Sequence, residues 1–319
     1  MSEKSICILG GTGFLGTRLA TRLARDGHSL LVPSRYREGG RHLLVLPSLT
    51  LVQDDPHDRD RLAARLRGCD VVINLVGILN ERGRDGSGFR RAHTEFARTV
   101  VHAAREAGVR RLLHMSALKA NAERGPSHYL RSKGEAEQVV REECGPDLAW
   151  TIFQPSVIFG PNDSFLNRFA GLLRFLPVLP LARPDARFAP VYVEDVVEAM
   201  VRCLEDADTW GQTYQLCGPT IYTLRELVTY VADTLERRRA IVGLPDWASR
   251  LQARIMDFVP GKPFSTDNDR SLTVNSVCSD SGFEALGLRP RSLETVAPRY
   301  LRRDTERRRL SDLRASARR

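Results

Sequence analysis

Short apolar runs alternate with longer amphipathic segments along the first two thirds of the chain. Runs rich in Leu, Val and Ile occupy residues 6–9, 29–33 and 49–52, and a continuous apolar run follows at residues 70–77. Continuous runs of this length are typical of strands that are buried on both faces of a parallel sheet. Because strand and helix patterns alternate, the sequence predicts an α/β fold with a doubly wound parallel sheet.

The segments between these runs repeat their apolar residues every three or four positions, as helices that pack on one face do. Helices are expected at about 14–26, 58–67, 90–107 and 129–143, and further strands at 111–116 and 150–153. After Pro161 the alternation gives way to short helices and loops. We therefore expect a sheet domain and a smaller, mostly helical C-terminal cap. The sheet domain would take residues 1–160 and 188–218, and the cap residues 161–187 and 219–298.

The first apolar run leads directly into a glycine-rich turn and then into a helix. Glycines allow such a turn to fold back sharply and let a pyrophosphate approach the main chain, where the N–H groups of the helix point at the anion. The glycines fit two spacings, G-x-G-x-x-G with Gly11, Gly13 and Gly16, and G-x-x-G-x-x-G with Gly10, Gly13 and Gly16. The alternative is an ordinary turn. The predicted dinucleotide contacts are Gly10, Thr12, Gly13, Phe14, Leu15 and Gly16.

The end of the second strand bears on the choice of cofactor. NAD-binding proteins of this type usually carry an acidic residue here, which accepts hydrogen bonds from the ribose. This chain has Ser34, Arg35 and Arg37 instead. Guanidinium groups suit a 2′-phosphate, so the sequence favours NADP(H) over NAD(H). In the alternative, the two arginines are only solvated loop residues.

Two further strand ends are expected to line the cofactor. A carboxylate of Asp54 or Asp55, after the third strand, could accept a hydrogen bond from the adenine amino group. The next strand ends in Leu75, Val76 and Gly77, at the carboxyl edge of the sheet, where ligands bind in such folds.

A tyrosine and a lysine four residues apart form the candidate catalytic pair. Tyr129 and Lys133 would project from one face of a helix, and a nearby ammonium favours the phenolate and lowers the tyrosine pKa. Ser116 ends the preceding strand and would hydrogen-bond a substrate carbonyl or alcohol. The pair alone also fits an ordinary amphipathic helix. The serine and the glycine turn make a reaction site the favoured interpretation.

Composition narrows the functional classes. The chain is 42% hydrophobic and 27% charged, and it contains no apolar run long enough to span a bilayer. Residues 299–319 hold nine arginines and three acidic residues, so they carry six of the nine net positive charges. The basic character is therefore that of a terminal tail, which we expect to be disordered, and a nucleic-acid-binding body is not implied.

Cysteine and histidine spacing argues against metal sites and disulfides. The six cysteines form no C-x-x-C pair, and several lie in or beside apolar runs, so we expect buried free thiols in a reducing cytoplasm. The seven histidines lack H-x-H or H-x-x-x-H spacing, so no metal site is predicted.

These motifs together resemble the extended and atypical short-chain dehydrogenase/reductases, a group that includes nucleotide-sugar epimerases and dehydratases. The resemblance rests on Gly10–Gly16, Ser116, Tyr129 with Lys133, and residues 155–161, and it covers about residues 4–298. Within that group the chain is most similar to bacterial relatives of the nucleotide-binding accessory subunit of respiratory complex I. Residues 72–75, 129–133, 165–169 and 190–196 support this.

The resemblance implies a Rossmann domain in which Gly10, Gly13 and Gly16 are the functional triplet and Gly11 is a spacer. It also implies that Tyr129 is the acid/base, Lys133 its partner and Ser116 the polarising group. It also implies cofactor contacts from Pro155, Val157 and His93. Extended members usually have Asn at the place of His93, so the usual proton relay is in question. The implied function is oxidoreductase or epimerase chemistry. The alternative is an accessory or redox-sensing protein that holds NADPH without turnover.

Two features leave the partner and the location open. Residues 247–258 form an amphipathic stretch with interleaved arginines, which either packs on the cap or contacts a membrane or lipid-like substrate. Residues 172–181 allow the same two interpretations. The predicted partners are a small molecule or a lipid- or quinone-like substrate, with a membrane or respiratory-complex contact. The predicted location is the cytoplasm, and the alternative is a peripheral position at the inner face of the membrane.

Overall fold

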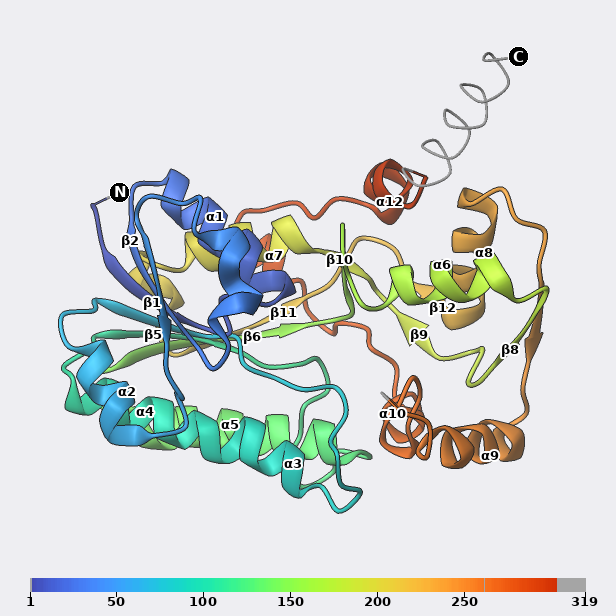
Figure 1. The fold of residues 1–319 in the computed structure, drawn as a ribbon, viewed down its shortest axis with the longest axis horizontal. Coiled ribbons are helices and arrows are strands. Elements are labelled where there is room, and N and C mark those ends of the chain that lie inside the picture. Colours follow the sequence, from blue (N-terminus) through green and yellow to red (C-terminus); the bar gives the residue numbers. More distant parts are fainter. Residues whose placement is uncertain (1, 261, 303–319) are drawn as a thin grey trace, which may run out of the picture. The chain divides into compact units, whose positions relative to one another are not determined.

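The computed structural model describes residues 2–260 and 262–302, which divide into two compact units (Figure 1). Of these residues, unit 1 contains 2–155, 194–216 and 279–288. Unit 2 contains 156–193, 217–278 and 289–302. The chain therefore passes several times between the units.

Unit 1 is built on a seven-stranded sheet with the order β11-β6-β5-β4-β1-β2-β3. The strands are β1 (Ser5–Leu9), β2 (Ser29–Ser34), β3 (Leu49–Gln53), β4 (Val71–Asn74), β5 (Arg111–Met115), β6 (Ala149–Pro155) and β11 (Gln212–Leu216). Every neighbouring pair is parallel. The predicted doubly wound parallel sheet is thus confirmed.

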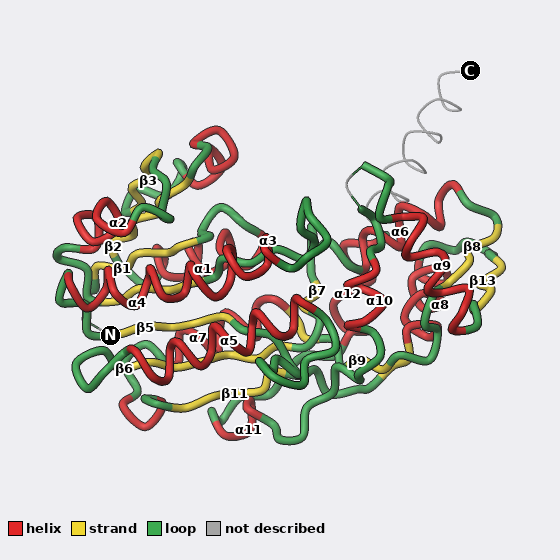
Figure 2. Tube along the Cα trace, turned by 90° about the horizontal axis from the view of Figure 1, so that it is seen from below, coloured by secondary structure: helices red, strands yellow, loops and turns green. Residues whose placement is uncertain are grey.

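Helices cover both faces of this sheet (Figures 1 and 2). One face carries α2 (Arg59–Leu66), α4 (Phe96–Glu106) and α5 (His128–Glu143), whose apolar residues form one buried core with those of the strands. The other face carries α1 (Phe14–Arg25) and α7 (Val193–Arg202), which are linked by ion pairs of Arg22 with Glu198 and Arg18 with Glu194. Smaller elements are α3 (Ser87–Arg90), α11 (Gly282–Ala285) and two 3-10 helices (Arg37–Leu43, Ala207–Thr209).

Unit 2 combines helices with three two-stranded sheets. Its helices are α6 (Leu166–Phe175), α8 (Leu224–Thr234), α9 (Asp246–Met256), α10 (Thr266–Ser271) and α12 (Leu293–Leu301). Its strands are β7 (Ile158–Phe159), β8 (Val178–Leu181), β9 (Arg187–Phe188), β10 (Val191–Tyr192), β12 (Tyr222–Thr223) and β13 (Ala240–Gly243). They pair as β10-β7, β12-β9 and β13-β8. The core lies between α6, α8, α12 and these strands.

The boundaries of these units differ from the expected ones. Residues 188–193 lie in unit 2, because β9 and β10 pair with β12 and β7 there. Residues 279–288 join unit 1, where α11 packs on β11. The arginine-rich segment does not begin at residue 299 as a tail, because α12 continues to Leu301, which is buried. The rest of the expected tail, residues 303–319, lies outside the described residues.

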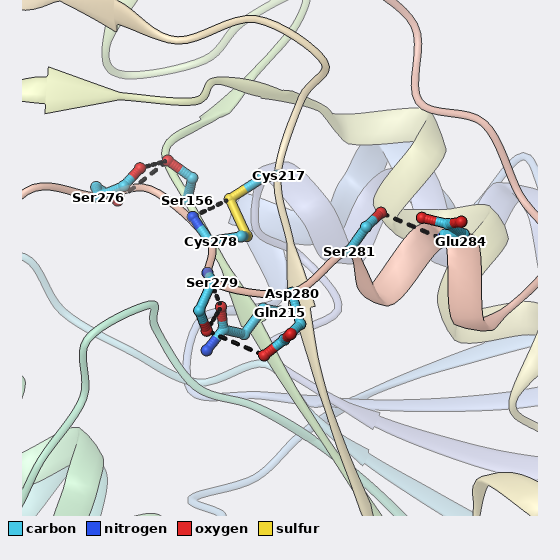
Figure 3. The surroundings of a disulfide bond; sticks show 9 residues. All are labelled: Ser156, Gln215, Cys217, Ser276, Cys278, Ser279, Asp280, Ser281 and Glu284. Atoms are coloured by element: carbon cyan, nitrogen blue, oxygen red, sulfur yellow. Dashed lines mark hydrogen bonds between the residues drawn. A yellow bond between two sulfur atoms is a disulfide. The ribbon is translucent and has the colours of Figure 1, made fainter.

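The expectation that all six cysteines are free is wrong. Cys217 and Cys278 form a disulfide across 61 residues of sequence (Figure 3). Cys217 directly follows β11, and Cys278 directly precedes Ser279. Each cysteine therefore lies where the chain passes from one unit to the other. Next to them, Ser156 donates to the carbonyl of Ser276 at 2.7 Å. Cys7, Cys69, Cys144 and Cys203 are buried free thiols, as expected.

Candidate cofactor and reaction site

The glycine turn after β1 has the shape that a dinucleotide site needs. Gly10 has φ +81°, a conformation that favours glycine. A Cβ on Gly16 would lie 2.3 Å from the carbonyl oxygen of Gly10, so only glycine allows α1 to pack this close to the turn. Gly13 precedes α1, and no side chain caps the first N–H groups of the helix there. These N–H groups and the positive end of the helix dipole are available to an anion.

Gly11 has a packing role that the sequence did not reveal. A Cβ at Gly11 would lie 2.9 Å from the Val32 side chain on β2, so the position is more than a spacer. A Cβ at Gly13, in contrast, would meet only the Gly10 carbonyl at 3.3 Å, and Gly13 is exposed. The open side of the turn therefore lies at Gly13, next to Phe14 and Leu15.

Basic side chains gather beyond the end of β2. Arg35 and Arg37 are exposed after Ser34, and the 3-10 helix that follows folds back so that Gly40 approaches the Thr12 methyl group. Burial, partly offset by Asp55, lowers the pKa of His57, and the guanidinium groups of Arg91 and Arg35 lower it further. Arg35 and Arg91 thus both act electrostatically on His57.

The two carboxylates after β3 are already engaged within the protein. Asp54 accepts from Arg65 at 2.9 Å, and this bond lowers the pKa of Asp54. Asp55 accepts from the backbone N–H of His57 at 3.1 Å. The expected hydrogen bond from an adenine to Asp54 would have to compete with its ion pair to Arg65.

Lys133 is buried at the carboxyl edge of the sheet. Its Nζ donates to the carbonyl of Met115, the last residue of β5, at 3.0 Å. It also donates to the carbonyl of Val76, just beyond β4, at 3.5 Å. A Cβ on Gly77 would lie 3.2 Å from this Nζ, so the backbone of Val76 and Gly77 lies against the ammonium. Burial, partly offset by Glu137, lowers the pKa of Lys133 to about 8.

Tyr129 lies one helical turn before Lys133 on α5. Its ring packs edge-on against the rings of His93 and Phe89, with centroid separations of 5.6 Å and 6.1 Å. Burial raises the pKa of Tyr129 to about 12. The expectation that Lys133 lowers this pKa is therefore wrong for the structure as it stands, because desolvation of the phenolate dominates.

His93 occupies a π-helical turn that the sequence pattern did not predict. Residues Arg91–Glu95 form a π-helix between α3 and α4, and such turns often occur at functional sites. The Nε2 of His93 accepts from the backbone N–H of Ile78 at 3.0 Å. Its Nδ1, 2.8 Å from the hydroxyl of Ser132, must then carry the proton. Burial and the charge of Lys133 lower the pKa of His93, so it is a neutral ring with a fixed tautomer.

Ser116 follows β5, but its hydroxyl is turned toward a buried carboxylate. It donates to Glu137 on α5, one turn beyond Lys133. Glu137 also accepts from Gln154 at 2.7 Å and from Arg141 at 2.9 Å. While Ser116 gives its single proton to Glu137, it has none to donate to a substrate carbonyl.

The last two predicted contacts fall in different units. Pro155 ends β6 in unit 1, where its carbonyl accepts from Leu118 N–H at 3.0 Å. Val157 belongs to unit 2. In the part of the chain that the structure describes, no group of three or more His, Cys, Asp or Glu side chains is placed to hold a metal ion.

Comparison with known families agrees with this arrangement. Residues 6–217 match the NAD dependent epimerase/dehydratase family, which is about two thirds of the chain. The chain belongs to this family. The resemblance to extended short-chain dehydrogenase/reductases is thereby confirmed, and the glycine turn, the tyrosine and the lysine lie within the matched residues.

Proteins that are similar to this chain differ in the functions that their names indicate. NADH dehydrogenase (ubiquinone) 1 alpha subcomplex subunit 9 of Arabidopsis thaliana is 32% identical, over 92% of this chain and 76% of its own length. Ceramide reductase of Caulobacter vibrioides is 34% identical, over 76% of this chain and 74% of its own length. The relatives therefore include both a subunit of NADH dehydrogenase (ubiquinone) and a reductase.

A solved structure extends the match to the whole fold. dTDP-glucose 4,6-dehydratase of Streptomyces venezuelae, solved with NAD bound, has a TM-score of 0.74 and 21% identity. The match covers 93% of this chain and 96% of that one. At this identity the likeness shows the shared fold alone.

Proposed function

We propose that this protein is an NADP(H)-dependent oxidoreductase or epimerase, which moves hydride between the nicotinamide and a carbon bearing a hydroxyl or carbonyl group. The observation that carries the proposal is the pairing of Tyr129 with Lys133 on α5, with Nζ held at the ends of β4 and β5. That edge of a parallel sheet is where ligands bind in doubly wound folds.

The residues of the turn fit a dinucleotide. The close packing of Gly16 and the open side at Gly13 leave room for a pyrophosphate against the N–H groups of Phe14 and Leu15. Thr12 and Gly10 complete the turn. Leu75, Val76 and Gly77 would line the next part of the cofactor, and His93, Pro155 and Val157 remain part of the proposal.

The preference for a 2′-phosphate rests on charge. Arg35 and Arg37 follow Ser34 where an acidic residue would select NAD(H), and Arg91 lies close enough to act on the same histidine as Arg35. Guanidinium groups bind phosphate with paired hydrogen bonds. Because Arg65 neutralises Asp54, this carboxylate would repel the 2′-phosphate only weakly. Asp55 remains the proposed acceptor for the adenine amino group.

The protein's own groups would handle the proton while the cofactor supplies or accepts the hydride. Tyr129 would donate its phenolic proton to the substrate oxygen during reduction and take it back during oxidation. Lys133 would exchange its carbonyl partners for the nicotinamide ribose hydroxyls and hold its charge near the phenolate that forms. The Glu137 carboxylate would balance the charge of Lys133, and Ser116 would act on substrate only after leaving Glu137.

Nucleotide-sugar, quinone and lipid ketones are the substrate classes that we propose to test. The full chain would be assayed for NADPH oxidation with one ketone of each class, beside Tyr129→Phe. The proposal expects turnover with at least one ketone and a loss of about 100-fold or more in Tyr129→Phe at unchanged NADPH affinity. Equal rates in the two proteins would exclude Tyr129 as the proton donor.

Two observations favour a second function. The hydroxyl of Ser116 is bound to Glu137 and the pKa of Tyr129 is raised, which suits a site that holds NADPH without turnover. In that case the protein is an accessory or redox-sensing protein at the cytoplasmic face of the membrane, in contact with a respiratory complex. NADPH binding without turnover of any ketone, together with copurification of such a complex, would favour this function.

A further inference from the structure

Helix α9 in unit 2 turns its large apolar side chains outward. Trp247 is 69% exposed, Leu251 49% and Ile255 59%, and Phe258, just beyond the helix, is 76% exposed. Their spacing of three or four residues places them in one stripe along the helix. We call these four residues the α9 stripe.

The opposite side of the helix explains this orientation. Ser249 and Ala253 are fully buried, so small residues rather than large ones face the protein. The Ser249 hydroxyl accepts from the backbone N–H of Arg183 at 3.2 Å, and Gln252 donates to the carbonyl of Pro180 at 3.4 Å. Just past the helix, Asp257 accepts from the Thr266 hydroxyl at 2.6 Å. These bonds fix the helix with its apolar stripe facing away from the core.

Two arginines run along one edge of the α9 stripe. Arg250 and Arg254 are exposed, one turn apart, and at 100° per residue they lie directly beside Trp247 and Leu251. Neither takes part in an ion pair among the described residues. The nearest acidic residues in sequence are engaged elsewhere, since Asp246 pairs with Arg183 at 3.0 Å and Asp257 holds Thr266. The stripe therefore has a net positive border.

A second apolar strip lies on the exposed face of the β8-β13 sheet. Val178 is 50% exposed and Val242 49% exposed, and Phe175, before β8, is 82% exposed. The bond from Gln252 to Pro180 joins α9 to β8, so both groups of exposed apolar residues belong to elements that are in contact. Exposed apolar area of this extent usually marks an interaction surface.

An anionic lipid surface is the occupant that fits these features. An apolar stripe with a tryptophan and a border of unpaired cations is the pattern of helices that lie in a membrane interface. With 11 residues α9 is about 16 Å long, too short to cross a bilayer. No helix within residues 2–260 and 262–302 is long and apolar enough to do so. We propose that the α9 stripe docks this protein on membranes that contain anionic phospholipid, with Arg250 and Arg254 on the headgroups.

Vesicle co-sedimentation of the full chain tests this proposal. Vesicles of phosphatidylcholine alone would be compared with vesicles that also contain phosphatidylglycerol. The arginine-rich residues 303–319 stay in every variant, so their contribution cancels. The stripe variant, with Ser at positions 247, 251, 255 and 258, is expected to lose about tenfold or more in partitioning. The double variant Arg250→Gln with Arg254→Gln is expected to partition about fivefold more weakly per arginine removed. This loss should occur only on vesicles that contain phosphatidylglycerol.

A matched control removes apolar residues that are as exposed but lie elsewhere. Val45→Ser with Trp210→Ser, at positions 79% and 50% exposed, should leave partitioning unchanged. NADPH affinity should also be unchanged in the stripe variant. That result would show that the variant folds, and it would separate membrane docking from the proposed function. Partitioning that is equal in the stripe variant and the wild type would overturn the proposal. So would a dimer in sedimentation velocity that the stripe substitutions dissociate.

Tryptophan fluorescence gives a second measurement. The chain has three tryptophans, so Trp150→Phe with Trp210→Phe leaves Trp247 as the only emitter. Its emission should shift to the blue on anionic vesicles and be quenched by brominated lipids. Emission that stays that of a water-exposed indole at saturating lipid would contradict the proposal.

Discussion

The ammonium of Lys133 lies 3.0 Å from the carbonyl oxygen of Met115, the last residue of β5. Among the described residues no carboxylate is in hydrogen-bond contact with this buried charge, and burial lowers the pKa of Lys133 to about 8. Glu137, one turn further along α5, offsets part of that cost. The ammonium is therefore ready to bind hydroxyl groups but loses its proton within an accessible pH range.

The first prediction concerns pH. Because the lowered pKa is about 8, Lys133 is charged below that pH and neutral above it. Charge-assisted hydrogen bonds contribute about 1.5–3 kcal/mol, so NADPH affinity should fall by about tenfold or more between pH 7 and 9.5. Isothermal titration over this range measures the effect. The control Lys133→Met should bind more weakly at pH 7 and show no such fall. The same decline in both proteins would mean that another group titrates.

The second prediction separates two glycines of the turn. Gly16→Ala places a methyl group 2.3 Å from the backbone of Gly10, so the helix must shift. We expect the free energy of unfolding to fall by about 3 kcal/mol or more, measured by urea denaturation.

Gly13→Ala is the matched change at the open side of the same turn. Gly13 has φ −79°, which alanine adopts freely, and its added Cβ meets only one oxygen at 3.3 Å. Stability should therefore change by less than about 1 kcal/mol, while NADPH affinity falls by roughly tenfold or more because the pyrophosphate must approach this backbone. Normal affinity in a folded Gly13→Ala protein would place the cofactor elsewhere.

The third prediction concerns the disulfide. Closing a loop of 61 residues restricts the unfolded chain, and the chain-entropy relation gives about 4 kcal/mol. Cys217→Ser with Cys278→Ser should lower the free energy of unfolding by up to that amount, and a reductant should have the same effect on the wild type. Cys203→Ala, at a buried free thiol, keeps the disulfide and serves as the control that should lose stability in reductant as the wild type does, whereas the double variant should not respond. Insensitivity of the wild type to reductant would show that the two cysteines are not joined in solution.

The sheet could be predicted because each strand is a local pattern. The apolar runs that end at Gly10, Ser34 and Gly77 determine both the strands and the ends where ligands bind. The spacing of Tyr129 and Lys133 is equally local, so the sequence alone predicts that one face of α5 carries both.

The remaining features depend on residues that are far apart in the sequence. Cys217 pairs with Cys278 because the fold brings together two segments that are 61 residues apart, and no rule on cysteine spacing predicts this. Ser116 follows its strand as predicted, yet the proximity of Glu137 decides where its proton points. The π-helical turn that orients His93 has no sequence pattern of its own, although a histidine in place of the family's asparagine marks the position.

We infer above all that the glycine turn of residues 10–16 binds a nicotinamide dinucleotide that carries a 2′-phosphate. Isothermal titration of the full chain with NADPH and NADH, beside Arg35→Ala, tests it most directly. We expect one site per chain, NADPH bound about tenfold or more tighter than NADH, and a preference that Arg35→Ala largely removes. Tighter binding of NADH, or no binding of either nucleotide, would contradict it.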